Sequence, residues 1–139
     1  MDVATSRKLA RYIAWGRVGI GATAIATPVL VSRPWIGDAA GQPASRLLAR
    51  AMGGRDLALG IGALRALALS DQEARPWVAL GGTADALDAV ATAIAFANLP
   101  RRWRWSILAV TVGAAAASIR AATTLDPVPS EPSPAPPGD

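Results

Sequence analysis

The stretch SILAVTVGAAAASI, residues 106–119, shows most directly what kind of fold this chain adopts. It contains no charged side chain, and its only polar side chains are those of Ser106, Thr111 and Ser118. An earlier stretch, VGIGATAIATPVLV at residues 18–31, is similar and has two threonines as its only polar residues. A helix of a water-soluble bundle needs a polar stripe along its length, and neither stretch provides one. Both stretches therefore favour helices that lie in a lipid bilayer.

Four apolar windows surround these stretches, at residues 12–31, 47–69, 77–99 and 105–125. Each window is about 20 residues long and, as a helix, would span a hydrocarbon layer of about 30 Å. Prolines lie between the windows, and tryptophans lie near the window edges, where aromatic side chains meet lipid headgroups. These residues are Pro34, Pro43, Pro76 and Pro100, with Trp15, Trp35, Trp77, Trp103 and Trp105. The sequence predicts an all-α fold over residues 1–125, an integral membrane bundle of four transmembrane helices with short loops.

The composition agrees with this prediction and excludes several kinds of chemistry. Of the 139 residues, 52% are hydrophobic and 17% are charged, whereas about 25% are charged in an ordinary soluble domain. With no Cys and no His, the chain cannot form a disulfide, a zinc site on thiolate or imidazole, or a Ser-His-Asp triad. We expect no metal and no cofactor. The net charge of +4 comes without a nucleic-acid-binding motif, so we expect no nucleic-acid partner.

A soluble, alanine-rich four-helix bundle is the alternative to a membrane bundle. No window contains the run of about 18 uncharged residues that is typical of a membrane helix. The second and third windows are interrupted by Arg55, Asp56, Arg65, Asp85 and Asp88. The two uncharged stretches nevertheless favour the bilayer as the environment of this bundle.

Four of these charged residues, Arg55, Asp56, Asp85 and Asp88, are expected at one depth near the middle of the membrane, because a helix rises about 1.5 Å per residue. Asp85 and Asp88 are three residues apart and share one helix face. Antiparallel pairing of the second and third windows would bring Arg55 to one or both of these aspartates. A low dielectric favours such Arg–carboxylate pairs, since an unpaired charge costs several kcal/mol there.

Arg17 completes the predicted charge network if the first helix supplies it. The network then holds two arginines and three aspartates, and the excess carboxylate would take up a proton or bind a cation. Taken by its own depth, Arg17 is expected near the headgroups, where, like Arg65 and Arg120, it would extend to them and anchor a helix end. The sequence leaves open whether the network fixes the helix register or forms a site for transport.

Four helices place both termini on one side of the membrane. The basic residues Arg7, Lys8 and Arg11 precede the first apolar window and favour a cytoplasmic N-terminus, with a dual topology as the alternative. We therefore expect a multi-pass protein of the plasma membrane. Residues 126–139, DPVPSEPSPAPPGD, are rich in proline and predict a disordered or polyproline II tail.

Three segments carry a resemblance to a known group of proteins: GRVGIG from Gly16, GGRDLALGIGAL from Gly53 and WVALGGTADALD from Trp77. In these segments the chain resembles the small four-helix membrane proteins of high-GC actinobacteria. No activity is assigned to that group, so the resemblance implies a fold and no function. The size and helix number are also similar to those of the small multidrug resistance transporters. Those transporters rely on a membrane-embedded Glu in the first helix, where this chain has Arg17 and no Glu.

The first functional hypothesis is a membrane protein without catalysis, acting as an accessory subunit of a membrane complex or as a homo-oligomer in the lipid bilayer. Small residues let membrane helices approach each other closely. The expected contact faces are Gly16, Gly19 and Gly21 on the first helix and residues 113–117 on the fourth.

The alternative hypothesis is a proton- or ion-coupled carrier of a small or lipophilic cargo. Asp85 and Asp88 would bind the proton or cation, and Arg55 would be the counter-ion. A membrane-embedded enzyme acting on lipid is less favoured, because these carboxylates would lie too deep for headgroup chemistry. We therefore lean against an enzyme.

Overall fold

The structure, a computed structural model, describes residues 2–125. The elements in this part of the chain are all helical. They are α1 (Val3–Ala26), α2 (Pro28–Ile36), η1 (Gly37–Gly41), α3 (Pro43–Leu69), α4 (Asp71–Ile94), η2 (Phe96–Asn98) and α5 (Arg104–Thr124), where η marks a 3-10 helix. The predicted all-α class is thus confirmed for these residues. The tail predicted at residues 126–139 lies outside them.

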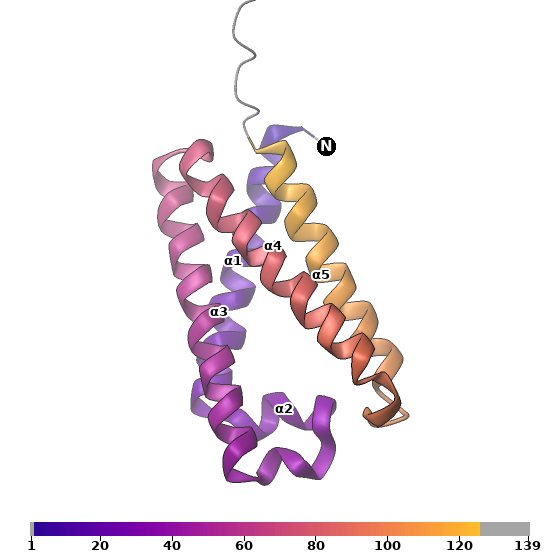
Figure 1. The fold of residues 1–139 in the computed structure, drawn as a ribbon. Coiled ribbons are helices and arrows are strands. Elements are labelled where there is room, and N and C mark those ends of the chain that lie inside the picture. The colour runs from indigo at the N-terminus through magenta and orange to yellow at the C-terminus, as the bar shows by residue number, and fades with distance from the viewer. Residues whose placement is uncertain (1, 126–139) are drawn as a thin grey trace, which may run out of the picture.

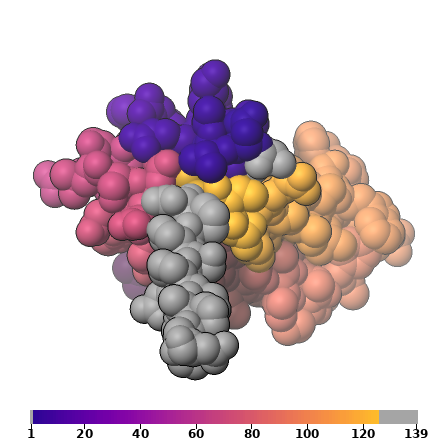
Figure 2. Space-filling view, turned by 90° about the horizontal axis from the view of Figure 1, so that it is seen from above, coloured from indigo at the N-terminus to yellow at the C-terminus, as the bar shows by residue number. Residues whose placement is uncertain are grey.

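The four long helices α1, α3, α4 and α5 alternate in direction (Figure 1). α1 packs closely against α3, α4 packs closely against α5, and the two pairs meet mainly where α3 contacts α4. The start of α1 and the end of α5 lie side by side (Figure 2), and the hydroxyl oxygens of Ser6 and Thr124 are 2.5 Å apart. We call this the termini end of the bundle. The opposite end, crossed by α2, is called the α2 end.

Polar side chains join the helices at the termini end. Asp2 caps α1 by accepting a hydrogen bond from the Thr5 amide at 2.7 Å, and this bond lowers the pKa of the Asp2 carboxyl below its usual value. Arg7 pairs with Asp71 and donates to the Leu67 carbonyl oxygen at 2.6 Å. The start of α1 is thereby tied to the turn between α3 and α4.

Glycines bring α1 and α3 into backbone contact. A Cβ atom on Gly53 would lie 2.8 Å from the Gly21 carbonyl oxygen, and one on Gly21 would lie 2.6 Å from the Gly53 carbonyl oxygen. Only residues without a side chain allow such an approach. The prediction that Gly21 lies on an outward contact face is therefore wrong. Gly16 and Gly19 have no atom within 4 Å of an added Cβ and do face open space.

The first predicted helix, residues 12–31, is broken in the structure. α1 ends at Ala26, and the segment Pro28–Gly41 bends away from it by 100°. Pro28 has no backbone N–H and begins a helix more easily than it continues one. Gly37, with φ +59°, then ends α2 in the left-handed conformation that glycine adopts without strain. The bundle consequently has four long helices and one short helix across its α2 end.

Pro76 lies inside α4, so its predicted role as a boundary between the second and third windows is wrong. α4 begins at Asp71 because the Ser70 hydroxyl oxygen accepts a hydrogen bond from the Glu73 amide at 3.1 Å. Acidic residues in the first turn also favour the positive end of the helix dipole. The spacing from Ser70 to Glu73 matches a capping box, which is the sequence signal for this earlier start.

Small residues fill the interior, and large apolar side chains point outward. The core at the termini end consists of Ala10, Ala66, Leu67, Ala74, Val78, Ala121, Ala122 and Leu125. On the outer surface, Ile94 is 80% exposed, Leu87 is 64% exposed and Val110 is 61% exposed. A bundle in water places its large apolar side chains inside, so this distribution is reversed.

Among residues 2–125, one helix, α5, is long and apolar enough to cross a membrane, with a mean hydropathy of 1.4. α1 reaches the same threshold only together with Pro28–Gly41, as a pair bent by 100°. Length and composition thus support one span, or two if the bent pair is counted. The four predicted spans are not confirmed by this measure.

The paired glycines of α3 give a test of the α1–α3 contact. We expect Gly53→Ala to lower the free energy of unfolding by about 1–3 kcal/mol, because the new Cβ would press on backbone and side-chain atoms of α1. Gly54 has nothing within 4 Å of an added Cβ, so Gly54→Ala should be neutral or stabilise by up to about 1 kcal/mol through helix propensity. Circular dichroism during SDS titration of detergent micelles measures both. Equal stability of the two variants would contradict the close contact.

Candidate functional site

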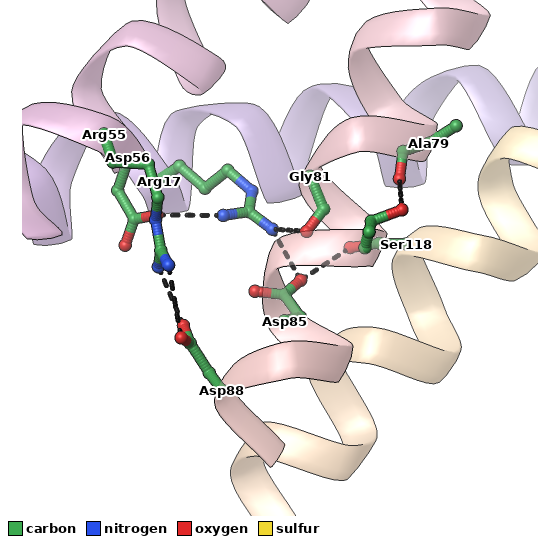
Figure 3. Close-up of polar contacts among 9 residues, drawn as sticks. Arg17, Arg55, Asp56, Ala79, Gly81, Asp85, Asp88 and Ser118 are labelled. Atoms are coloured by element: carbon green, nitrogen blue, oxygen red, sulfur yellow. Dashed lines mark hydrogen bonds and ion pairs between the residues drawn. The ribbon is translucent and has the colours of Figure 1, made fainter. Parts of the chain in front are cut away.

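Arg17 lies at the centre of a charged network between the long helices (Figure 3). The residue is buried, with 8% of its surface exposed. Its Nη1 donates to Asp56 Oδ1 at 3.1 Å, and its Nη2 donates to Asp85 Oδ2 at 2.5 Å. The same Nη2 donates to the Gly81 carbonyl oxygen at 2.6 Å. One guanidinium therefore joins α1 to both α3 and α4.

Arg55 forms the second half of the network. Its Nη1 and Nη2 face the two carboxylate oxygens of Asp88 at 3.2 Å and 2.7 Å, which is the two-point geometry that Arg and carboxylate favour. Arg55 also donates to Asp56 Oδ1, from Nε at 3.3 Å and from Nη2 at 3.1 Å. Asp56 is thus shared between the two arginines.

Ser118 brings the fourth long helix, α5, into the network. Its Oγ donates to Asp85 Oδ2 at 3.1 Å, and only 1% of the residue is exposed. Sequence reasoning did not include Ser118 among the site residues. The sequence signal that points to Ser118 is its spacing of seven residues from Thr111, because this spacing places both polar side chains on one helix face. Both residues are buried in the structure.

Two adjacent glycines of α4 make room for the network. A Cβ on Gly81 would lie 3.1 Å from Arg17 Nε and from Arg17 Nη2. A Cβ on Gly82 would lie 3.1 Å from the Ser118 Cβ atom. Each glycine therefore faces a different helix, and together they let α4 approach both α1 and α5.

The structure brings all five residues of the predicted network together: Arg17, Arg55, Asp56, Asp85 and Asp88. The sequence predicts Arg55 next to Asp85, Asp88 or both, without deciding between them. In the structure Arg55 takes Asp88, and Asp85 is held by Arg17 instead. The two arginines and three aspartates leave one carboxylate in excess.

The expectation that Arg17 is a headgroup anchor is wrong. Its guanidinium is buried between helices and donates to Asp56, Asp85 and the Gly81 carbonyl oxygen inside the bundle. Arg65 and Arg120, which were assigned the same role, are exposed near helix ends. Arg17 differs from Arg65 and Arg120 because the rotation of its helix turns it toward the bundle interior. The position of a residue along a helix does not predict this rotation.

The network is closed on one side and partly open on the other. The side chains of Arg17 and Asp85 are 9% and 15% exposed, whereas those of Arg55 and Asp88 are 34% and 29% exposed. Within residues 2–125, no group of three or more Asp or Glu side chains is placed to hold a metal ion. The network thus consists of paired charges, and its outer pair, Arg55 with Asp88, is accessible from the surface.

Comparison of this chain with protein-family models, with curated proteins and with solved structures finds no match. The resemblance to actinobacterial membrane proteins stays a prediction. The geometry of the network and of the outer surface is therefore the basis for the function proposed below.

Removing the central guanidinium tests the role of the network. We expect Arg17→Met to destabilise the bundle by about 3–5 kcal/mol, because it leaves the Asp85 carboxylate without a cation, whereas Asp56 keeps its pair with Arg55. The double variant Arg17→Met/Asp85→Asn should recover part of this loss, since the carboxylate that lost its cation is replaced by a neutral amide. Detergent unfolding of both variants and of the wild type measures the coupling.

The matched control is Arg33→Met. Arg33 pairs with Asp38 at 3.4 Å, and the two side chains are 69% and 99% exposed. Loss of such an exposed pair is expected to cost less than about 1 kcal/mol. If Arg17→Met is as stable as Arg33→Met, the network does not hold the bundle together.

Proposed function

We propose that this chain is a small integral membrane protein without catalysis, a homo-oligomer or an accessory subunit of a larger membrane complex. In this proposal α1, α3, α4 and α5 span the bilayer. The observation that carries it is the reversed distribution of side chains, with large apolar residues outside and a charged network inside. Lipid tails are as apolar as leucine, so such a surface is stable in a bilayer.

The positions of the charged side chains support the membrane location. The charges in the middle of α3 and α4 belong to the network, and pairing reduces the cost of burying them in a low dielectric. The exposed basic residues of the four long helices lie in the first or last few turns, from where long side chains reach the headgroups. They are Lys8, Arg11, Arg46, Arg50, Arg65, Arg75 and Arg120, and two further exposed basic residues, Arg101 and Arg102, lie in the turn before α5.

Small residues on the outer surface support association with another helix. Gly16 and Gly19 on α1 and Gly113 on α5 have no atom within 4 Å of an added Cβ. Membrane helices associate through faces of this kind, since small residues allow close packing. A second copy or a larger subunit would contact α1 or α5 at these positions.

Introduced cysteines test the membrane location without background, because the chain has no cysteine of its own. The probe positions are Ala4→Cys at the termini end, Gly41→Cys at the α2 end and Leu87→Cys on the outer face of α4. We expect plasma membrane insertion with a cytoplasmic N-terminus. An impermeant maleimide should then label Gly41→Cys on intact spheroplasts, and Ala4→Cys only after permeabilisation.

Leu87 is 64% exposed in the structure, yet Leu87→Cys should stay unlabelled in both conditions because lipid covers it. Rapid labelling of Leu87→Cys would contradict the membrane location. Light scattering of the detergent-purified protein tests the association. A bare monomer of 14.2 kDa would rule out both the homo-oligomer and the stable subunit.

One observation favours a second candidate function, a proton- or ion-coupled carrier of a small or lipophilic cargo. The outer pair of Arg55 and Asp88 stays partly exposed near the middle of its helices, and the network has one carboxylate in excess. Asp85 or Asp88 would take up the proton or cation, with Arg55 as the counter-ion.

Vesicles loaded with a pH-sensitive dye test this carrier function. If the protein carries protons, Asp88→Asn should reduce the proton flux by about tenfold or more, because the variant removes a titratable group. The control is Asp71→Asn, which alters a carboxylate at the termini end and should keep the wild-type flux. Equal fluxes in the wild type and Asp88→Asn would rule out a carrier that uses this residue.

A further inference from the structure

The turn between α4 and α5 concentrates unpaired positive charge. Arg101 and Arg102 lie in this turn, Arg104 follows them as the first residue of α5, and no acidic residue lies between Asp88 and the end of α5. None of the three arginines forms an ion pair with a carboxylate of residues 2–125. α5 begins here without a side-chain cap and without an acid in its first turn, so the positive end of its dipole adds to the same field.

Two of these arginines make cation–π contacts with aromatic rings. The Arg104 guanidinium carbon lies 5.1 Å from the centre of the Phe96 ring, and that of Arg102 lies 5.6 Å from the Trp103 ring. Phe96 in turn contacts Trp105 edge to face, with ring centres 4.7 Å apart. A guanidinium that stacks on a ring keeps its N–H donors free at its edge. The contacts thus orient the arginines without using their hydrogen bonds.

Arg104 also has a buried donor without a partner. Its Nε is the one buried side-chain nitrogen or oxygen in the described part of the chain that makes no hydrogen bond. Arg17 and Arg55, by contrast, donate to carboxylates and a carbonyl within the bundle. A buried donor without an acceptor carries a free-energy cost, because it has lost its hydrogen bond to water without gaining another. An external anion would remove this cost.

We propose that this turn binds the phosphate group of an anionic phospholipid at the membrane surface, an inference that rests on the membrane location proposed above. Guanidinium edges match phosphate oxygens. A lipid is favoured over free phosphate by the neighbouring residues. Trp103 and Trp105 are 45% and 66% exposed, as in an aromatic belt at headgroup depth, and the turn leads directly into the helix that is apolar enough to cross a membrane.

Native mass spectrometry of the full chain, released from mixed micelles of phosphatidylglycerol and phosphatidylcholine, tests this site. We expect the wild type to retain phosphatidylglycerol with about tenfold preference, as is typical of several basic residues near an anionic surface. The triple variant Arg101→Gln/Arg102→Gln/Arg104→Gln should lose that preference. The control Lys8→Gln/Arg11→Gln/Arg120→Gln removes the same charge at the termini end and should keep it.

Three results would overturn the proposal: an unchanged preference in the triple variant of the turn, an equal loss in the control, or displacement of the lipid by inorganic phosphate. The last result would assign the turn to a free anion. Cysteine labelling separates the two proposals. Normal insertion without a lipid preference overturns the lipid site alone, whereas failure to insert overturns the membrane location and this site with it.

Discussion

The buried guanidinium of Arg17 is the interaction on which the rest of the bundle depends. It binds Asp56 of α3, Asp85 of α4 and the Gly81 carbonyl oxygen at one point between the helices. A buried charge that loses its partner is strongly destabilising, by about 3–5 kcal/mol. Any sliding or rotation of one helix would break at least one of these contacts, so the network fixes the register of α1, α3 and α4 together. Ser118 extends the same constraint to α5.

The small-residue interior follows from this central contact. A guanidinium can reach two other helices only if their backbones come close, and glycines at the α1–α3 contact and beside Arg17 on α4 allow that approach. Close backbones leave little room for large side chains between the helices, and most large apolar side chains consequently point outward. A mean hydropathy counts every charged residue of a helix, including those that are paired inside the bundle. The mean hydropathy of α3 and α4 is therefore lower than the apolar character of their outer surfaces. The bilayer proposal accounts for both the apolar surface and the paired charges.

The two ends of the bundle differ in how their polar groups are satisfied. At the termini end, Arg7 pairs with Asp71, and Ser6 and Thr124 share a hydrogen bond. At the α2 end, Arg102 and Arg104 stack on aromatic rings, and neither they nor Arg101 find a carboxylate within the described residues. Arginines that stack on rings keep open donors, and such donors favour an anionic partner. This asymmetry distinguishes the two faces that the bundle would present to the membrane.

The sequence by itself determined the helical class and the common depth of Arg55, Asp56, Asp85 and Asp88, because helix formation and rise per residue are local properties. Only the tertiary structure decided that Asp85 belongs to Arg17, that Arg17 is buried, and that Ser118 joins the network. Those facts depend on how each helix is rotated about its axis, and contacts such as Gly21 with Gly53, which are distant in sequence, set that rotation. The bend at Pro28 and the early start of α4 before Pro76 have a local origin instead, a proline that begins a helix and a capping box from Ser70 to Glu73.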